Sequence, residues 1–369
     1  MMRPAFSSTW QAVAFALLLL FFLVSPLLLG KNNLPPREQA YASAGWDWGP
    51  YPWITKQIFE ETNDIDIAFI GSSRIDWGID TPQVQQALDA QLGRRSVVRT
   101  IGWGGAGFDA LYFITKDLLA RRHVKTLVFY DESIGHHPNP KAPKWFSFAA
   151  DAGDLAGMPL RDQAIFYFAA MTGLPDDLQE LVLPNLPEDT NSQTSKYYET
   201  HYQAANPEAR LGSIFGRINF DSVIGANTNF IPYLPRTGAT AAEVSCYLPQ
   251  TATNFLFLNR PLPAWQSHFA RKFALLAQQN GCRLVLLHLP TIGEQNASVI
   301  TETEYWPAYL QAKVDMVGIP GGRLFAGLSE DQMKQLYGDW FHLNENGQKY
   351  FTALITPALL QLYENQPGH

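Results

Sequence analysis

The stretch IDIAFIGSSRIDWG, Ile65 to Gly78, decides which fold this chain is expected to adopt. Six mostly apolar residues lead directly into Gly71, two serines and an arginine. A short apolar run that ends at a turn residue is typical of a buried β-strand. Ser72 and Ser73 then have two readings, because a serine after a strand either caps the next helix or presents a reactive hydroxyl.

The residues that follow alternate between strand and helix patterns. Apolar runs at 96–101 and 124–130 predict two further strands, and helical periodicity is present at 81–92 and 107–122. Strands that alternate with helices in this way form a parallel sheet whose two faces are covered. The sequence therefore predicts an α/β domain.

The alternation stops at Asp131 and resumes near Pro263. The intervening residues are rich in Pro, Asn, Tyr and Phe, and their clearest helical pieces are DQAIFYFAAM and PDDLQELV. A segment of this length between regular elements is uncommon in a compact domain. We therefore interpret residues 131–263 as an inserted cap region.

The C-terminal part returns to the first pattern. We predict a strand at 282–289, a short further strand at 321–327, and helices at 264–281, 329–337 and 344–365. Boundary residues support the helices. The predicted boundary residues are Thr81 as an N-cap followed by Pro82, Gly281 as a C-cap and Ser329 as an N-cap.

The first thirty residues differ from the rest of the chain. No charged residue occurs between Trp10 and Gly30, and this run approaches the roughly 20 apolar residues that cross a bilayer as a helix. A cleaved secretory signal is the alternative, but the small residues Ala42 to Ala44 lie too far downstream for its cleavage site. We favour a retained anchor at 1–30, a linker and lead-in at 31–60, and a domain at 61–369.

The charged residues, cysteines and histidines limit the partners, disulfides and metals that we expect for this chain. The net charge is −7 and the basic residues are scattered, so we do not expect nucleic acid as a partner. Cys246 and Cys282 form a disulfide in one reading and are buried thiols in the other, and both readings stay open. His136 and His137 are adjacent, and neighbouring side chains in an extended segment point in opposite directions. We therefore expect no metal and no cofactor.

Three polar stretches fall where the predicted strands end or just before the last helix. They are 71–74, 102–107 and 338–347. In open α/β sheets, ligands bind beyond the carboxyl ends of the strands. A serine nucleophile needs an imidazole as base and usually a carboxylate that orients the imidazole, and Asp339 and His342 supply both groups. The serine would then come from a different strand end.

These motifs resemble those of the SGNH (GDSL-type) hydrolase superfamily. The resemblance depends on glycine and serine after the first strand, a glycine-bearing loop after the second, and D-x-x-H followed by LNENGQKYF. It implies Ser73 as the nucleophile, because the family's serine stands two residues after the glycine. It also implies His342 as the base, Asp339 as its orienting carboxylate, and a three-layer flavodoxin-like fold with a central parallel sheet.

The same resemblance implies an oxyanion hole. Its donors would be the Ser73 amide, the amide of Gly105 or of the neighbouring Gly104, and an asparagine after the third strand. The sequence departs from the family here, since Asp131 to Ser133 stand where the asparagine is expected and ionised carboxylates donate no hydrogen bond. Asn139 of the insertion is one substitute donor.

The GSSR form together with an N-terminal span is similar to membrane-anchored SGNH-like acyltransferases of the DltD-like and alginate-acetylation kinds. The function implied is serine-dependent acyl transfer or ester hydrolysis outside the cytoplasm, with acetyl as the expected group and a cell-surface or exported polysaccharide as the substrate. A membrane-bound acyl donor protein is an expected partner. The alternative is a carbohydrate-binding or assembly scaffold that keeps the fold without catalysis.

Two further side-chain predictions concern the neighbourhood of the serines. We expect Arg74 to form a structural salt bridge, with a substrate carboxylate or phosphate as the alternative ligand. Trp77 and Trp103 follow the two strand ends nearest the proposed site, so they are candidates for stacking on a sugar ring.

Overall fold

Five parallel strands form one sheet in the order β2-β1-β3-β4-β5. The computed structural model describes residues 7–29, 37–42, 51–102, 107–130, 151–166, 264–291, 294–295, 312, 314–337 and 342–364. The strands are β1 (Ile65–Gly71), β2 (Val98–Gly102), β3 (Val124–Tyr130), β4 (Arg283–Leu287) and β5 (Asp315–Val317). The predicted α/β class with a central parallel sheet is thereby confirmed.

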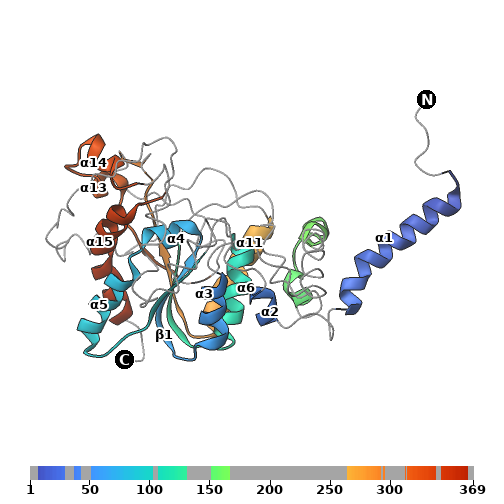
Figure 1. Ribbon diagram of the computed structural model, residues 1–369, viewed down its shortest axis with the longest axis horizontal. Coiled ribbons are helices and arrows are strands. Elements are labelled where there is room, and N and C mark those ends of the chain that lie inside the picture. Colours follow the sequence, from blue (N-terminus) through green and yellow to red (C-terminus); the bar gives the residue numbers. More distant parts are fainter. Residues whose placement is uncertain are drawn as a thin grey trace, which may run out of the picture.

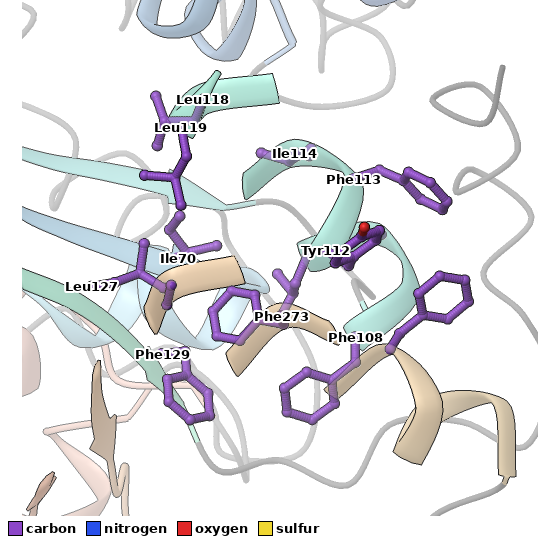
Figure 2. Packing of buried hydrophobic residues seen from close by; sticks show 14 of the residues in the cluster. Ile70, Phe108, Tyr112, Phe113, Ile114, Leu118, Leu119, Leu127, Phe129 and Phe273 are labelled. Atoms are coloured by element: carbon purple, nitrogen blue, oxygen red, sulfur yellow. The ribbon is translucent and has the colours of Figure 1, made fainter. Parts of the chain in front are cut away.

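One face of the sheet is covered by α6 (Phe108–Leu119) and α11 (Ala264–Gln279). Aromatic rings fill the space between these layers, as Figure 2 shows for Phe129 of the sheet and for Phe108 and Phe273 of the helices. The Phe129 ring centroid lies 5.2 Å from that of Phe273 and 6.1 Å from that of Phe108. Edge-to-face packing at such distances adds to the stability that the buried area supplies.

The opposite face is covered by helices that lie together at one side of Figure 1. They are α4 (Ser73–Gly78), α5 (Thr81–Leu92), α13 (Gly321–Leu324), α14 (Glu330–Lys334) and α15 (Glu345–Glu364). The inner strands alternate between the two layers, because Ile67 and Phe69 face these helices whereas Ala68 and Ile70 face α6 and α11. Helices on both faces make three layers.

Two sequence predictions about the elements were wrong. The fifth strand is β5, Asp315–Val317, whereas residues 321–327, predicted as a strand, contain the helix α13. A strand of three residues is too short to show the alternating pattern by which a strand is recognised in a sequence. The N-cap of α5 is Asp80 and not Thr81, because the Asp80 carboxylate accepts a hydrogen bond from the Gln83 amide at 3.2 Å.

Other boundary predictions are confirmed. Ser329 caps α14 through a capping box with Gln332. Gly281 follows α11 with φ +69°, a conformation that glycine adopts without strain. Of the predicted insertion, the structure describes residues 151–166 alone, which include the short helix η3 (Ala152–Leu155) and a helical stretch at 160–166.

The N-terminal part contains α1 (Thr9–Leu29), α2 (Arg37–Ala42), α3 (Tyr51–Thr55) and the π-helical turn η1 (Lys56–Glu60). Within the residues described, no helix is found that has both the length and the apolar character needed to span a bilayer. The predicted linker is partly structured, because α2 and α3 lie within it.

A cluster of charged side chains fixes α2 to the domain. The Arg37 guanidinium contacts Asp117 of α6 at 2.7 Å and Asp151 at 2.6 Å. Lys116 joins Asp151 at 2.8 Å to Asp154 of η3 at 2.6 Å. Buried carboxylates that are paired in this way avoid the cost of an isolated charge. Both α2 and η3 are therefore held against α6.

The register of β1 and β2 leaves no room for a side chain at Gly102. Gly102 pairs with Gly71, and a Cβ at Gly102 would lie 2.7 Å from the Gly71 carbonyl oxygen. We predict that Gly102→Ala lowers the free energy of unfolding by about 1–3 kcal/mol, because the two strand ends must separate. Urea unfolding measures the change.

Gly153→Ala is the matched control, because no atom lies within 4 Å of a Cβ built there. The control should stay within about 0.5 kcal/mol of the parent protein. Equal effects of the two substitutions would contradict the close packing of β1 against β2.

Candidate functional site

α4 begins directly where β1 ends. Ser72 is its N-cap, and the Ser72 hydroxyl accepts a hydrogen bond from the Arg74 amide at 3.3 Å. Ser73 is therefore the first residue of the helix, although its side chain lies outside the described part. The interpretation as a helix cap is therefore confirmed for Ser72. Ser73 is left as the candidate for the reactive hydroxyl.

The residues on either side of 338–341 are joined to each other before α15. Tyr337 and Leu343 form an antiparallel bridge. The Asn344 side-chain amide donates to the Gln335 carbonyl at 2.6 Å and to the Tyr337 carbonyl at 3.3 Å, while its oxygen accepts from the Gly347 amide at 3.0 Å. The sequence LNENG thus forms hydrogen bonds that hold the two ends of the segment 338–342 together.

Two contacts bring this turn to α4. The Gln348 side chain donates to the carbonyl oxygens of Asp76 and Ile79 at 3.0 and 3.1 Å, and its amide is buried. The ring centroids of Trp77 and His342 lie 4.3 Å apart. Elements that are some 270 residues apart in the chain therefore meet at one edge of the sheet.

The structure describes some of the predicted site residues and not others. His342 lies beside α4, the helix that Ser73 opens. Asp339 and Gly105 lie outside the described residues, as do Gly104 and Trp103. The same holds for the insertion residues discussed above, Asp131 to Ser133, His136, His137 and Asn139, and for Cys246.

Asp76 is a buried carboxyl group that the sequence analysis did not single out. It is 2% exposed, and its Oδ2 has no hydrogen-bond partner among the described groups. Its Oδ1 lies against Gly102, at the end of β2. Burial raises the pKa of Asp76 well above its usual range, because it disfavours the charged form of the carboxyl group. One signal was available, an acidic residue three positions after Ser73.

Among the described residues, Arg74 has no partner for the structural salt bridge that we expected. Its side chain is buried, and a guanidinium Nη2 donates to the carbonyl of Leu289, just beyond β4. Within the described part of the chain it contacts no carboxylate, and its Nε has no acceptor. A buried cation with one neutral acceptor is incompletely compensated.

A second imidazole and carboxylate pair lies in the loop after β4. His288 Nε2 lies 3.0 Å from Glu294 Oε2, and Glu294 also accepts hydrogen bonds from the Thr291 amide and hydroxyl at 2.8 and 2.9 Å. Burial opposes ionisation, yet these hydrogen bonds and the His288 charge lower the pKa of Glu294 to about 2. Neither a periodic pattern nor a motif in the sequence indicates this pair.

Burial revises the prediction for Trp77 and supports the thiol reading for Cys282. Trp77 is 3% exposed, so its ring face is not available to a sugar. Its ring instead packs against His342. Cys282 is a buried free thiol whose pKa burial raises to about 12. No group of metal-ligating side chains is found among the residues that the structure describes.

Two comparisons with known proteins give no match. No family model matches the chain, and a search of curated proteins finds no significant match. The case for a function therefore depends on the side chains at this edge of the sheet.

The first prediction for the site concerns Gln348. Gln348→Met removes two donors from carbonyls at the end of α4, and a buried unsatisfied acceptor costs about 1–3 kcal/mol. We expect a loss of that size in the free energy of unfolding, measured by urea titration. Gln361→Met on the exposed face of the same helix is the control and should be nearly silent. A silent Gln348→Met would mean that α15 does not position α4.

The second prediction for the site concerns pH. The pKa of Asp76 is higher in the folded protein than in the unfolded protein, so folding takes up a proton at this residue. The stability that is linked to this proton is complete below the unfolded pKa of about 4 and is lost as the pH rises. Asp76→Asn removes the ionisable group, and with it this loss of stability at higher pH. The stability gain over the parent protein should therefore grow between pH 4 and pH 8 in urea titrations.

Asp64→Asn, at an exposed carboxylate, is the control for a general charge effect. A stability difference for Asp76→Asn that does not change with pH would contradict a raised pKa of Asp76 in the folded protein.

Proposed function

We propose that this chain is an SGNH-like acyl-transfer or ester-hydrolysing enzyme in which Ser73 is the nucleophile. The observation that carries the proposal is the contact between α4 and the turn of His342, through the Trp77 ring at 4.3 Å and the two Gln348 hydrogen bonds. A serine and a histidine from distant parts of the chain act together when folding places their elements side by side.

In this mechanism the Ser73 hydroxyl attacks an acyl ester while His342 accepts its proton. His342 then returns the proton to the leaving or accepting hydroxyl, and Asp339 stabilises the imidazolium. The amides of Ser73 and Gly105 bind the oxyanion. The loss of one oxyanion donor typically lowers kcat about 100- to 1,000-fold. The missing asparagine after β3 therefore favours a slow hydrolase or an enzyme that uses an acceptor other than water.

The cellular setting is part of the same proposal. A retained N-terminal helix would hold the domain outside the cytoplasm, where it acts on an exported or cell-surface polysaccharide with acetyl as the transferred group. A membrane-bound protein would then supply the acyl donor. The uncharged run from Trp10 to Gly30 is what supports the anchor.

A non-catalytic scaffold is the second candidate function. It is favoured by the residues Asp131 to Ser133, which replace the expected asparagine. A scaffold of this kind would bind carbohydrate or hold a modification complex together, and it would keep its activity without a serine nucleophile.

Paired serine substitutions separate the two functions. Ser73→Ala should lower the turnover of p-nitrophenyl acetate at least about 1,000-fold, because it removes the nucleophile. Ser72→Ala removes the N-cap of α4 and keeps Ser73, so it should cost about 0.5–2 kcal/mol of stability and leave most of the activity. Labelling by a serine-directed phosphonate should be lost in the Ser73 variant alone.

His342→Ala should reduce the same turnover by a comparable factor if the imidazole is the base. Full activity in the Ser73 variant, or activity that depends on Ser72 instead, would overturn the enzyme proposal in favour of the scaffold.

A further inference from the structure

The large apolar side chains that stay exposed among the described residues fall into two groups. Eight belong to α1, and outside α1 they are Leu160, Ile165 and Leu275, which are 82%, 41% and 51% exposed. Isolated apolar side chains are common on protein surfaces, whereas a shared apolar patch marks a contact with a partner or a membrane. The question is therefore whether these side chains share one surface.

Leu160 and Ile165 belong to the segment 151–166, which packs on α11. Phe166 is fully buried, and its ring centroid lies 5.4 Å from that of Phe269 of α11. Ile165 is exposed because adjacent residues of a helix point in different directions. The segment therefore presents Leu160 and Ile165 to solvent while Phe166 holds it against α11.

Leu275 lies on the same side of α11 as the contact of this helix with η3. Lys272 of α11 forms an ion pair with Asp154 of η3 at 2.9 Å. Leu275 follows Lys272 by three positions, and residues with this spacing are neighbours on a helix surface. The exposed apolar side chains outside α1 therefore belong to one surface, formed by α11 and the segment 151–166.

This surface adjoins the part of the domain to which α1 is tethered. Asp151 of the segment contacts Arg37 of α2 at 2.6 Å, and seven residues separate α1 from α2. In Figure 1 the segment, coloured green, lies on the side of the domain that carries α2. Residues 17–20 of α1 are all leucines, point in successive directions around the helix and are each at least half exposed. A helix that is apolar on every side is covered by lipid or by protein.

The charge of this surface differs from that of the whole chain. The chain has a net charge of −7, yet α11 contains no acidic residue and exposes Arg271. Arg161 of the segment is exposed as well. Of the acids in the segment, Asp151 and Asp154 are paired with lysine or arginine, and Asp162 is half-buried. Apolar side chains beside exposed basic ones are typical of a surface that contacts anionic lipid headgroups.

We propose that this surface lies on the headgroup region of a bilayer that contains anionic lipid. Its exposed apolar and basic residues, which we call the lipid-facing patch, are Leu160, Arg161, Ile165, Arg271 and Leu275. The inference rests on the proposed function, because the anchor at 1–30 has to be held by the same bilayer. It adds an orientation of the domain to that anchor. Since α11 covers one face of the sheet and α4 the other, the helix that Ser73 opens lies on the far side of the sheet from the lipid.

A fluorophore that senses lipid tests the proposal on the full chain. Ala164 is exposed within the helical stretch 160–166, so Ala164→Cys labelled with nitrobenzoxadiazole reports whether this stretch leaves water. Cys246→Ser removes one native thiol, and Cys282 stays unreactive because it is buried and its pKa is raised to about 12. The labelled chain is reconstituted into phosphatidylcholine vesicles with or without about one third phosphatidylglycerol.

In vesicles with phosphatidylglycerol, the label at position 164 should emit at shorter wavelength and be quenched by lipid that is spin-labelled at the headgroup. Leu160→Gln combined with Ile165→Gln should lower the ratio of lipid-contacting to water-exposed label roughly 10- to 100-fold, because burial of each apolar side chain favours the contact. Arg161→Gln combined with Arg271→Gln should remove the preference for phosphatidylglycerol.

Gln361→Cys, labelled in the same way, is the matched control. Gln361 is exposed on α15, in the layer on the opposite face of the sheet, so its label should stay in water. Equal quenching at positions 164 and 361 would contradict the proposed orientation. Equal quenching at position 164 in both kinds of vesicle would overturn the assignment to anionic lipid.

The outcomes separate this inference from the proposed function. A chain that does not float with vesicles would overturn the anchor and the orientation together. A chain that floats while the label at position 164 stays in water would overturn this inference alone and leave the patch to a protein partner. Turnover of p-nitrophenyl acetate through Ser73 is measured without vesicles, so it is independent of both results.

Discussion

The structure depends on one buried amide that joins the two ends of the domain. Gln348 of α15 donates to the carbonyls of Asp76 and Ile79, which lie at the end of α4 and have few partners within so short a helix. These hydrogen bonds set the position of α4 against the sheet, and with it the position of Ser73. The contact of Trp77 with His342 follows from the same placement.

The charges at the carboxyl edge of the sheet are distributed unevenly. The pair of His288 and Glu294 is satisfied within one loop, whereas Arg74 has a single neutral acceptor among the described residues. Burial of a charge is costly unless the charge is paired, so the described residues compensate the Glu294 carboxylate more fully than the Arg74 guanidinium.

The long elements were predictable from sequence, and the short ones were not. Strong apolar periodicity located β1, β3 and α11 to within a few residues, because burial repeats along each of them. β5 has three residues. It pairs with β4, and this contact between separate strands is not predicted by any local sequence pattern. The roles of Ser73, His342, Asp339 and Gly105 stay predictions, although the structure places His342 beside the helix that Ser73 opens. The burial of Asp76 and the missing partner of Arg74 required coordinates, because both depend on neighbours remote in sequence.

The charged cluster around Arg37 has a geometric consequence for the whole chain. Arg37 is fixed to α6, and seven residues separate it from Leu29, the end of α1, so the Cα atoms of Leu29 and Arg37 lie at most roughly 28 Å apart. Whatever holds α1 in place therefore also keeps Arg37, and with it the last turn of α6, within that distance of Leu29.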